Sequence, residues 1–306
     1  MAKGKSVGSS FGSGKIRILF PVIILLSAMI ATVVIAACGS QSSAPSGTTP
    51  TTTTQQAIPK IIIKAVDFSY EQPQTVSAGL VDVTLVNNGS QPHQMQLARI
   101  TNGNFDEFKT TLDKKGPGAA LGLSTLYGGV NTLDPGQSGE AILNLPSGQY
   151  ASICFVSGAD NVAHYMKGMI IHFSVTGLPN GSLAQPKSTA EIMLKDFTFV
   201  LPNTIPAGPV ILKVTNQGPQ PHELDLLKLA QGKTLEDAKT FLNSNNPAGP
   251  PPFTDAGGMG ALALGSSAWL KLTLQPGNYV AVCFVPDAKT GKPHYMLGMI
   301  SSFTVA

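Results

Sequence analysis

Four side chains able to bind a metal ion recur in the same order at two places in the chain. Each set holds two histidines, one cysteine and one methionine: His93, Cys154, His164 and Met169, then His222, Cys283, His294 and Met299. A thiolate, two imidazoles and a weak thioether form a soft donor set that suits copper in both oxidation states. Calcium and magnesium prefer oxygen ligands instead. The pattern therefore favours copper at both places.

The two cysteines have other possible uses. A third cysteine, Cys38, lies near the N-terminus, which leaves Cys154 and Cys283 as one thiol in each set. Exported proteins normally pair their cysteines. A disulfide between them would require two equivalent strand positions to meet, and no acid marks the partner that a catalytic nucleophile needs. A buried, inert thiol is the plainest alternative to a metal ligand, and the histidines and methionines could likewise serve packing alone.

An internal repeat explains why the two sets match. Residues 67–70, Asp-Phe-Ser-Tyr, recur 129 positions later as residues 196–199, Asp-Phe-Thr-Phe. After the cysteine the displacement becomes 130, so that residues 164–169 match residues 294–299. One domain has thus been duplicated, with a single insertion in one loop.

The elements that carry the sets are expected to be short strands. Charged residues are sparse, whereas Gly, Pro, Val and Thr are abundant, a balance that favours strands and turns. Helical spacing occurs only near residues 105–112 and 235–242. We expect an all-β fold with a Greek-key β-sandwich in each copy and a short helix in a long connection. The first copy's strands are predicted at residues 61–65, 81–86, 141–145, 150–155 and 170–175.

The N-terminus has the character of an export signal. A basic stretch precedes an almost wholly apolar run from Ile18 to Ala37, and the segment Ile35-Ala36-Ala37-Cys38 resembles the bacterial lipoprotein box. That resemblance implies a lipid on Cys38. An uncleaved transmembrane anchor is the alternative, because twenty apolar residues can also span a bilayer. The rest of the chain is then expected on the extracytoplasmic face of the cell membrane.

The chain is predicted to divide into five parts. They are a lipoprotein signal peptide at 1–37, a Ser/Thr/Pro-rich tether at 38–59, a first domain at 60–176, a linker at 177–189 and a second domain at 190–306. Four of the 20 basic side chains lie in the signal segment, so the remainder has no basic excess. We therefore expect no nucleic-acid partner.

The motifs around the donor residues resemble those of the cupredoxins, the type 1 blue-copper family. Each copy carries Asn-x-Gly-x-x-Pro-His, then Gly-x-Tyr-x-x-x-Cys, then His followed by Met five positions later. The resemblance implies that the two histidines and the cysteine of each copy are equatorial copper ligands and that Met169 and Met299 are axial. Met166 and Met296 are rival axial residues.

Two departures from that family pattern bear on the sites. Nine and ten residues separate the cysteine from the second histidine, a loop comparable in length to that of copper nitrite reductases. The family often has Asn after the first histidine, where it connects two ligand loops, but this chain has Gln94 and Glu223. We expect sites of similar architecture and unequal properties.

The histidine count limits the catalytic chemistry that the sequence predicts. The two sites use four of the five histidines and leave only His172. Copper oxidases and reductases built from such domains need further histidines, so we expect a one-electron carrier and not an enzyme. A copper-free accessory or adhesion module and a copper scavenging or delivery protein are the alternatives. The expected partner is a redox protein or a copper donor.

Overall fold

The computed structural model describes residues 57–179, 183–244 and 247–306. The predicted signal peptide, Cys38 and nearly all of the predicted tether lie outside these residues. Within the described part, no helix combines the length and apolarity needed to cross a membrane.

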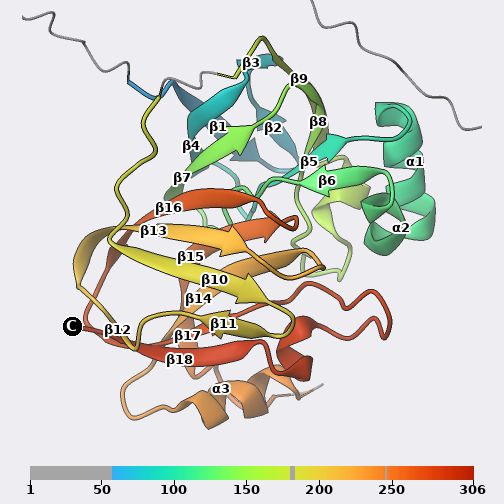
Figure 1. Ribbon diagram of the computed structural model, residues 1–306. Coiled ribbons are helices and arrows are strands. Elements are labelled where there is room, and N and C mark those ends of the chain that lie inside the picture. The colour runs from blue at the N-terminus through green and yellow to red at the C-terminus, as the bar shows by residue number, and fades with distance from the viewer. Residues whose placement is uncertain (1–56, 180–182, 245–246) are drawn as a thin grey trace, which may run out of the picture. The chain divides into compact units, whose positions relative to one another are not determined.

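The first copy of the repeat is a sandwich of two sheets (Figure 1). The chain crosses between the sheets after β2, β3, β4, β6 and β7, which is a Greek-key course. One sheet has the order β2 (Ser69–Glu71), β1 (Lys60–Val66), β4 (Gly79–Asn87), β7 (Ser138–Leu145). The other has the order β3 (Thr75–Ser77), β9 (Ile170–Thr176), β8 (Gly148–Ile153), β5 (Gln96–Ile100), β6 (Ser124–Leu126).

The second copy repeats this arrangement. One of its sheets has the order β11 (Thr198–Val200), β10 (Ala190–Lys195), β13 (Gly208–Asn216), β16 (Ser267–Leu274). The facing sheet has the order β12 (Thr204–Ile205), β18 (Ile300–Val305), β17 (Gly277–Val282), β14 (His222–Leu229), β15 (Phe253–Leu262). The all-β, double-sandwich fold predicted from the sequence is confirmed.

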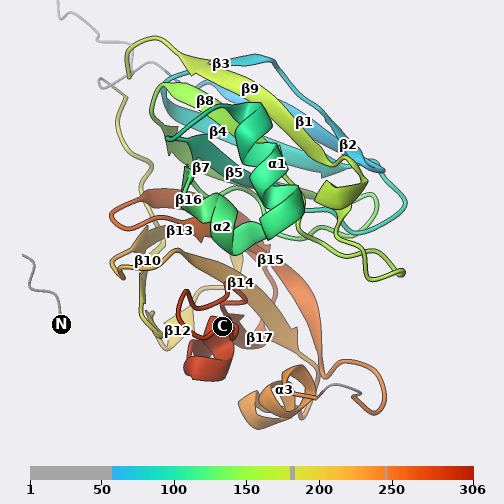
Figure 2. The same cartoon turned by 90° about the vertical axis from the view of Figure 1, so that its right-hand side faces the viewer.

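Helices cover the outer faces of the smaller sheets. In the first copy α1 (Phe105–Lys115) begins with a capping box from Asn104, and α2 (Pro117–Leu121) begins with a proline at its first turn. In the second copy α3 (Leu235–Leu242) begins with a capping box from Thr234. Figure 2 shows α1 and α2 lying over β5 and β8. The helices predicted near residues 105–112 and 235–242 are confirmed, and α2 is an addition to them.

The two copies share one sheet. Strand β7 pairs antiparallel with β16, which joins four strands from each copy into a continuous eight-stranded sheet. Ala141 lies opposite Leu270, its counterpart at the repeat displacement of 129. In the facing layer, Val130 likewise bridges its own counterpart, Met259. Backbone pairing between two strand edges therefore holds the copies together in both layers.

Candidate metal centres

The first copy brings its predicted cysteine and histidines to one point. His93 lies before β5, Cys154 directly follows β8, and His164 begins the short 3₁₀ helix η1 (His164–Lys167). The Nδ1 atoms of the two imidazoles are 3.0 Å apart, and Cys154 Sγ lies 3.6 Å from His164 Nδ1 and 3.9 Å from His93 Nδ1. All three side chains are fully buried. A trigonal site with bonds of about 2.0 to 2.3 Å separates its donors by about 3.5 to 4.0 Å, which these distances approach.

The second copy repeats the cluster. His222 Nδ1 lies 2.9 Å from His294 Nδ1, and Cys283 Sγ lies 3.5 Å from His294 Nδ1. In each copy, the three donor atoms lie within 4.8 Å of one another. His294 begins η2 (His294–Leu297), the counterpart of η1. The same local sequence therefore forms the same cluster twice.

A buried asparagine shapes the loop that presents the first histidine. The side-chain amide of Asn87 donates to the carbonyls of Gln91 and Leu133, and its oxygen accepts from the backbone N–H of Gly89. Asn216 makes the corresponding three hydrogen bonds in the second copy. The Asn-x-Gly part of the motif thus closes the turn that aims the following histidine at the cluster.

An aspartate orients each first histidine. The Nε2 atom of His93 lies 2.6 Å from Asp67 Oδ1, and His222 Nε2 lies 2.5 Å from Asp196 Oδ1. A carboxylate at Nε2 places the imidazole proton there and leaves the Nδ1 lone pair free for a metal. Sequence reasoning noted these aspartates only as markers of the repeat. Their repetition in both copies did not distinguish them from the other duplicated residues, and only the structure places them beside the histidines.

The glycine of the same motif leaves room for that hydrogen bond. A methyl group at Gly89 would lie 2.4 Å from Asp67 Oδ1 and 2.6 Å from His93 Nε2. At Gly218 the corresponding distances are 2.6 Å to Asp196 Oδ1 and 2.7 Å to His222 Nε2. Any larger residue at this position would separate the aspartate from the histidine.

Burial fixes the protonation of the donors. It raises the pKa of the Cys154 thiol to about 11 and that of Cys283 well above its usual value. Burial, together with the nearby His222, lowers the pKa of His294 to about 4, and burial also lowers the pKa of His164. The imidazoles of His164 and His294 are therefore neutral at pH 7, and a neutral imidazole has a lone pair that can bind a metal. A metal that binds must displace a proton from each thiol, so binding releases protons.

The second histidine of each site is closed off from water. The Nε2 atoms of His164 and His294 are buried and have no hydrogen-bond partner. The ring of Phe68 lies edge-on to His164 at 4.9 Å, and Phe197 lies at 5.0 Å from His294. Each phenylalanine directly follows the orienting aspartate of its copy. The repeated Asp-Phe dipeptide therefore contacts both histidines of its site, the first through the aspartate and the second through the phenylalanine.

The two candidate axial methionines of each copy differ in burial. Met169 and Met299 are fully buried, and each accepts a backbone hydrogen bond from the cysteine of its copy. The side chains of Met166 and Met296 are 57% and 45% exposed. Burial beside the cysteine favours Met169 and Met299 as the axial residues, which stays a prediction. Tyr165 and Tyr295 are buried, so an apolar surface patch that includes them is not formed.

The two sites differ at three neighbouring positions. The hydroxyl of Tyr70, close to Cys154, donates to the carbonyl of Gln94, whereas the second copy has Phe199 at that position. Ser90 donates twice to Asp67 and lowers its pKa to about 2, but its counterpart is Pro219.

The third difference is the residue after the first histidine. Glu223 accepts from the backbone N–H of Phe284 at 2.7 Å and so joins the two ligand loops of the second site. The backbone N–H of Gln94 lies 3.5 Å from Cys154 Sγ, and the backbone of Glu223 bonds Cys283 in the same way, so the two sites differ here in the side chains. A hydrogen bond near a thiolate changes how well the site accommodates the reduced metal. The residues around the two donor sets therefore differ, although the donor sets are the same.

The surroundings of the two cysteines bear on whether they form a disulfide, act as nucleophiles or bind a metal. Cys154 and Cys283 are both free and buried, each within the cluster of its own copy. No disulfide joins them. Both thiols are fully buried and burial raises their pKa, so neither is the accessible, activated thiol that a nucleophile requires. The soft, buried, convergent donor set fits copper, with up to two ions in the chain.

Comparison with known proteins gives likenesses of structure only. No family model matches the chain, and no curated protein matches it. An auracyanin from the photosynthetic bacterium Roseiflexus castenholzii is 24% identical, with 38% of this chain and 94% of that chain covered and a TM-score of 0.26. Auracyanin A, a "blue" copper protein from Chloroflexus aurantiacus, is 21% identical, with 39% and 100% covered and a TM-score of 0.29.

Longer solved structures match both copies. The blue copper oxidase from Nitrosomonas europaea is 15% identical, with 81% of this chain and 86% of that chain covered and a TM-score of 0.25. Copper nitrite reductases are also among the matches. These matches contradict the prediction that the chain is not an enzyme, because oxidases and reductases are enzymes, and that prediction is not retained. The chain carries two cupredoxin-like sandwiches, each with one cluster of copper-type donors.

Proposed function

We propose that this chain is a copper protein that accepts and passes single electrons through two type 1-like centres. The observation that carries the proposal is the convergence of Cys154, His93 and His164, and of their second-copy counterparts, in buried clusters. Copper, when bound, supplies a one-electron redox couple that these ligands accept in both oxidation states. A copper-free accessory module gives no reason for a thiol and two imidazoles to converge in a buried cluster.

The chain's own residues prepare both clusters before any metal binds. The aspartates hold the first histidines, the asparagines hold the loops, and backbone hydrogen bonds hold the methionines beside the cysteines. The surrounding β-sandwich keeps water out of both clusters. A cage that is already ordered has little to rearrange when the charge of the site changes, and this favours rapid electron transfer.

The proposal extends to location and partner. We propose that the chain is exported, carries a lipid on Cys38 and works at the extracytoplasmic face of the cell membrane with a redox protein or copper donor. The support is the basic and apolar N-terminus followed by the lipoprotein-like segment that ends at Cys38. Labelling of growing cells with a radioactive fatty acid tests the anchor. The label should enter the parent chain and be absent from Cys38→Ser.

Copper reconstitution tests the centres. Purified protein given cupric ion should develop an intense visible band from thiolate-to-copper charge transfer. That band should weaken in Cys154→Ser or Cys283→Ser alone and vanish when both are changed. Retention of the band in the double variant would show that the thiols are not ligands. Voltammetry should then give a reversible one-electron wave, whereas copper binding without such a wave would indicate scavenging or delivery.

A further inference from the structure

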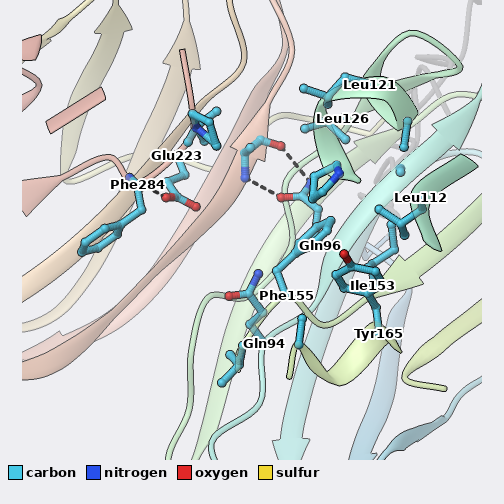
Figure 3. A pocket seen from close by; sticks show the side chains of 18 of the residues that line it. Gln94, Gln96, Leu112, Leu121, Leu126, Ile153, Phe155, Tyr165, Glu223 and Phe284 are labelled. Carbon is cyan, nitrogen blue, oxygen red and sulfur yellow. Dashed lines mark hydrogen bonds between the residues drawn. The ribbon is translucent and has the colours of Figure 1, made fainter. Parts of the chain in front are cut away.

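A cavity of about 590 Å³ lies beside both clusters. Figure 3 shows Leu112, Leu121 and Leu126 of the first copy on one side and Glu223 and Phe284 of the second copy on the other. Pockets of about 300 to 1,000 Å³ hold small organic molecules. The electron-transfer proposal assigns no role to this space.

The wall of the cavity is mainly apolar. It is lined by aromatic and aliphatic side chains from α1, α2 and β8 and from the segments after the two cysteines, among them Phe108, Leu112, Leu121, Ile153, Phe155 and Phe284. Such a wall favours a compact ring system, because rings bury a large apolar area with little loss of conformational freedom.

The polar groups of the wall are acidic or neutral. Glu223, Asp225, Asn131 and Gln94 line the cavity, and no Lys, Arg or His is found among the described lining residues. Gln96 also reaches the cavity, but its amide is already bonded to Gly128, Ala261 and its own strand. An anionic ligand would lose its hydration in this wall and find no cation to balance its charge, so the cavity disfavours anions.

One carboxyl in the wall has an unused hydrogen-bonding atom. Asp225 is only 7% exposed, and its Oδ1 atom has no hydrogen-bond partner. A buried carboxyl oxygen without a partner is costly, and native proteins rarely leave one. A hydroxyl group is the matching partner, because it can donate to a carboxylate and can also accept from a protonated carboxyl.

We propose that this cavity binds a small neutral molecule made of an aromatic ring system with a hydroxyl group, which hydrogen-bonds to Asp225. The apolar wall holds the ring, and the carboxyl selects the hydroxyl. Binding of this ligand requires no metal, so it can be tested on copper-depleted protein. If the ligand does not bind, the proposed electron-transfer function is unaffected.

The test compares three fluorescent probes of similar shape. Copper-depleted full-length protein is titrated with 2-naphthol, with naphthalene and with 2-naphthoate. We expect 2-naphthol to bind about tenfold more tightly than naphthalene, since one satisfied buried hydrogen bond is worth about that ratio. The anionic 2-naphthoate should bind more weakly than either. Equal binding of 2-naphthol and naphthalene, or tighter binding of the anion, would overturn the proposal.

Variants locate the site. Asp225→Leu should abolish the preference for 2-naphthol while retaining naphthalene, and Asp225→Asn should keep part of the preference because the amide still hydrogen-bonds. Glu191→Gln, a change at an exposed carboxyl outside the cavity wall, is the matched control and should leave all three affinities unchanged. Full preference for 2-naphthol in folded Asp225→Leu would refute the role of this carboxyl. If Asp225→Leu does not fold, Asp225→Ala decides, because it also removes the hydrogen-bonding group and an undiminished preference in it carries the same refutation.

Discussion

The substitution Gly89→Ala isolates the contribution of the aspartate–histidine hydrogen bond to copper binding. The added methyl carbon would lie 2.4 Å from Asp67 Oδ1 and 2.6 Å from His93 Nε2, in the middle of a hydrogen bond of 2.6 Å. Ordinary carbon contacts begin at about 3.5 Å, so each polar atom must move by about 1 Å. The hydrogen bond cannot survive that displacement.

The expected cost follows from the role of the hydrogen bond. Loss of a partner that orients a ligating histidine lowers metal affinity by about 10- to 100-fold, which is about 1.4 to 2.8 kcal/mol. The measurement is a competition titration with a copper chelator, made in a Cys283→Ser background so that only the first copy keeps a complete donor set. Asp67→Ala in the same background should give a loss of similar size.

A matched glycine provides the control. A methyl group at Gly118 in α2 would meet no atom within 4 Å, so Gly118→Ala should leave copper affinity unchanged. Thermal unfolding of the metal-free proteins separates a local effect from a loss of fold. If folded Gly89→Ala binds copper within about twofold of the parent, with the same visible band, then the aspartate does not orient the histidine and the reasoning is wrong.

Two further predictions concern the asymmetry of the sites and the joint between the copies. Tyr70→Phe removes a hydroxyl that donates to the carbonyl of Gln94, and the second copy has no such hydroxyl. Because the backbone N–H of Gln94 faces Cys154 Sγ, loosening of Gln94 weakens that hydrogen bond. The midpoint potential of the first site, measured by voltammetry, should therefore fall by up to about 60 mV, equivalent to a hydrogen-bond effect of about 1.4 kcal/mol. Lys271 donates to both Asp82 and Glu140, and although burial opposes it, this ammonium lowers the pKa of Glu140 to about 2. A carboxyl with a depressed pKa stabilises the fold above its unfolded pKa and loses that contribution as pH falls. Lys271→Met should therefore cost about 1 to 3 kcal/mol in urea unfolding at pH 7 and much less near pH 2, where Glu140 becomes protonated, and an equal cost at both pH values would contradict this.

The sequence predicted the strands well, and it identified the histidines and cysteines that the structure brings together, because both leave local signals. Alternating apolar residues mark strands such as β4, and the motif spacing marks Cys154 and His164. The resemblance to a known family then gave the order of the ligands. Convergence of these residues in space follows from the sandwich, in which the loops at one end of two facing sheets meet.

Other features depend on contacts that no local pattern records. Asp67 lies 26 residues before His93, and nothing in the spacing shows that their side chains meet. The same holds for Asp225, whose place in the cavity wall depends on how the second copy packs against α2. The pairing of β7 with β16 is also non-local, because any exposed strand edge can pair with many others.

The register of that pairing has a consequence for the origin and behaviour of the chain. Ala141 faces Leu270 and Val130 faces Met259, so in both layers a residue meets its own counterpart. This is the pattern of an isologous interface, in which a twofold axis relates two identical subunits. The duplicated chain thus has the organisation of a homodimer whose subunits have been fused. A single repeat expressed alone would carry a bare, self-complementary edge at β7 or β16, and such an edge is suited to pairing with a second molecule of the same repeat.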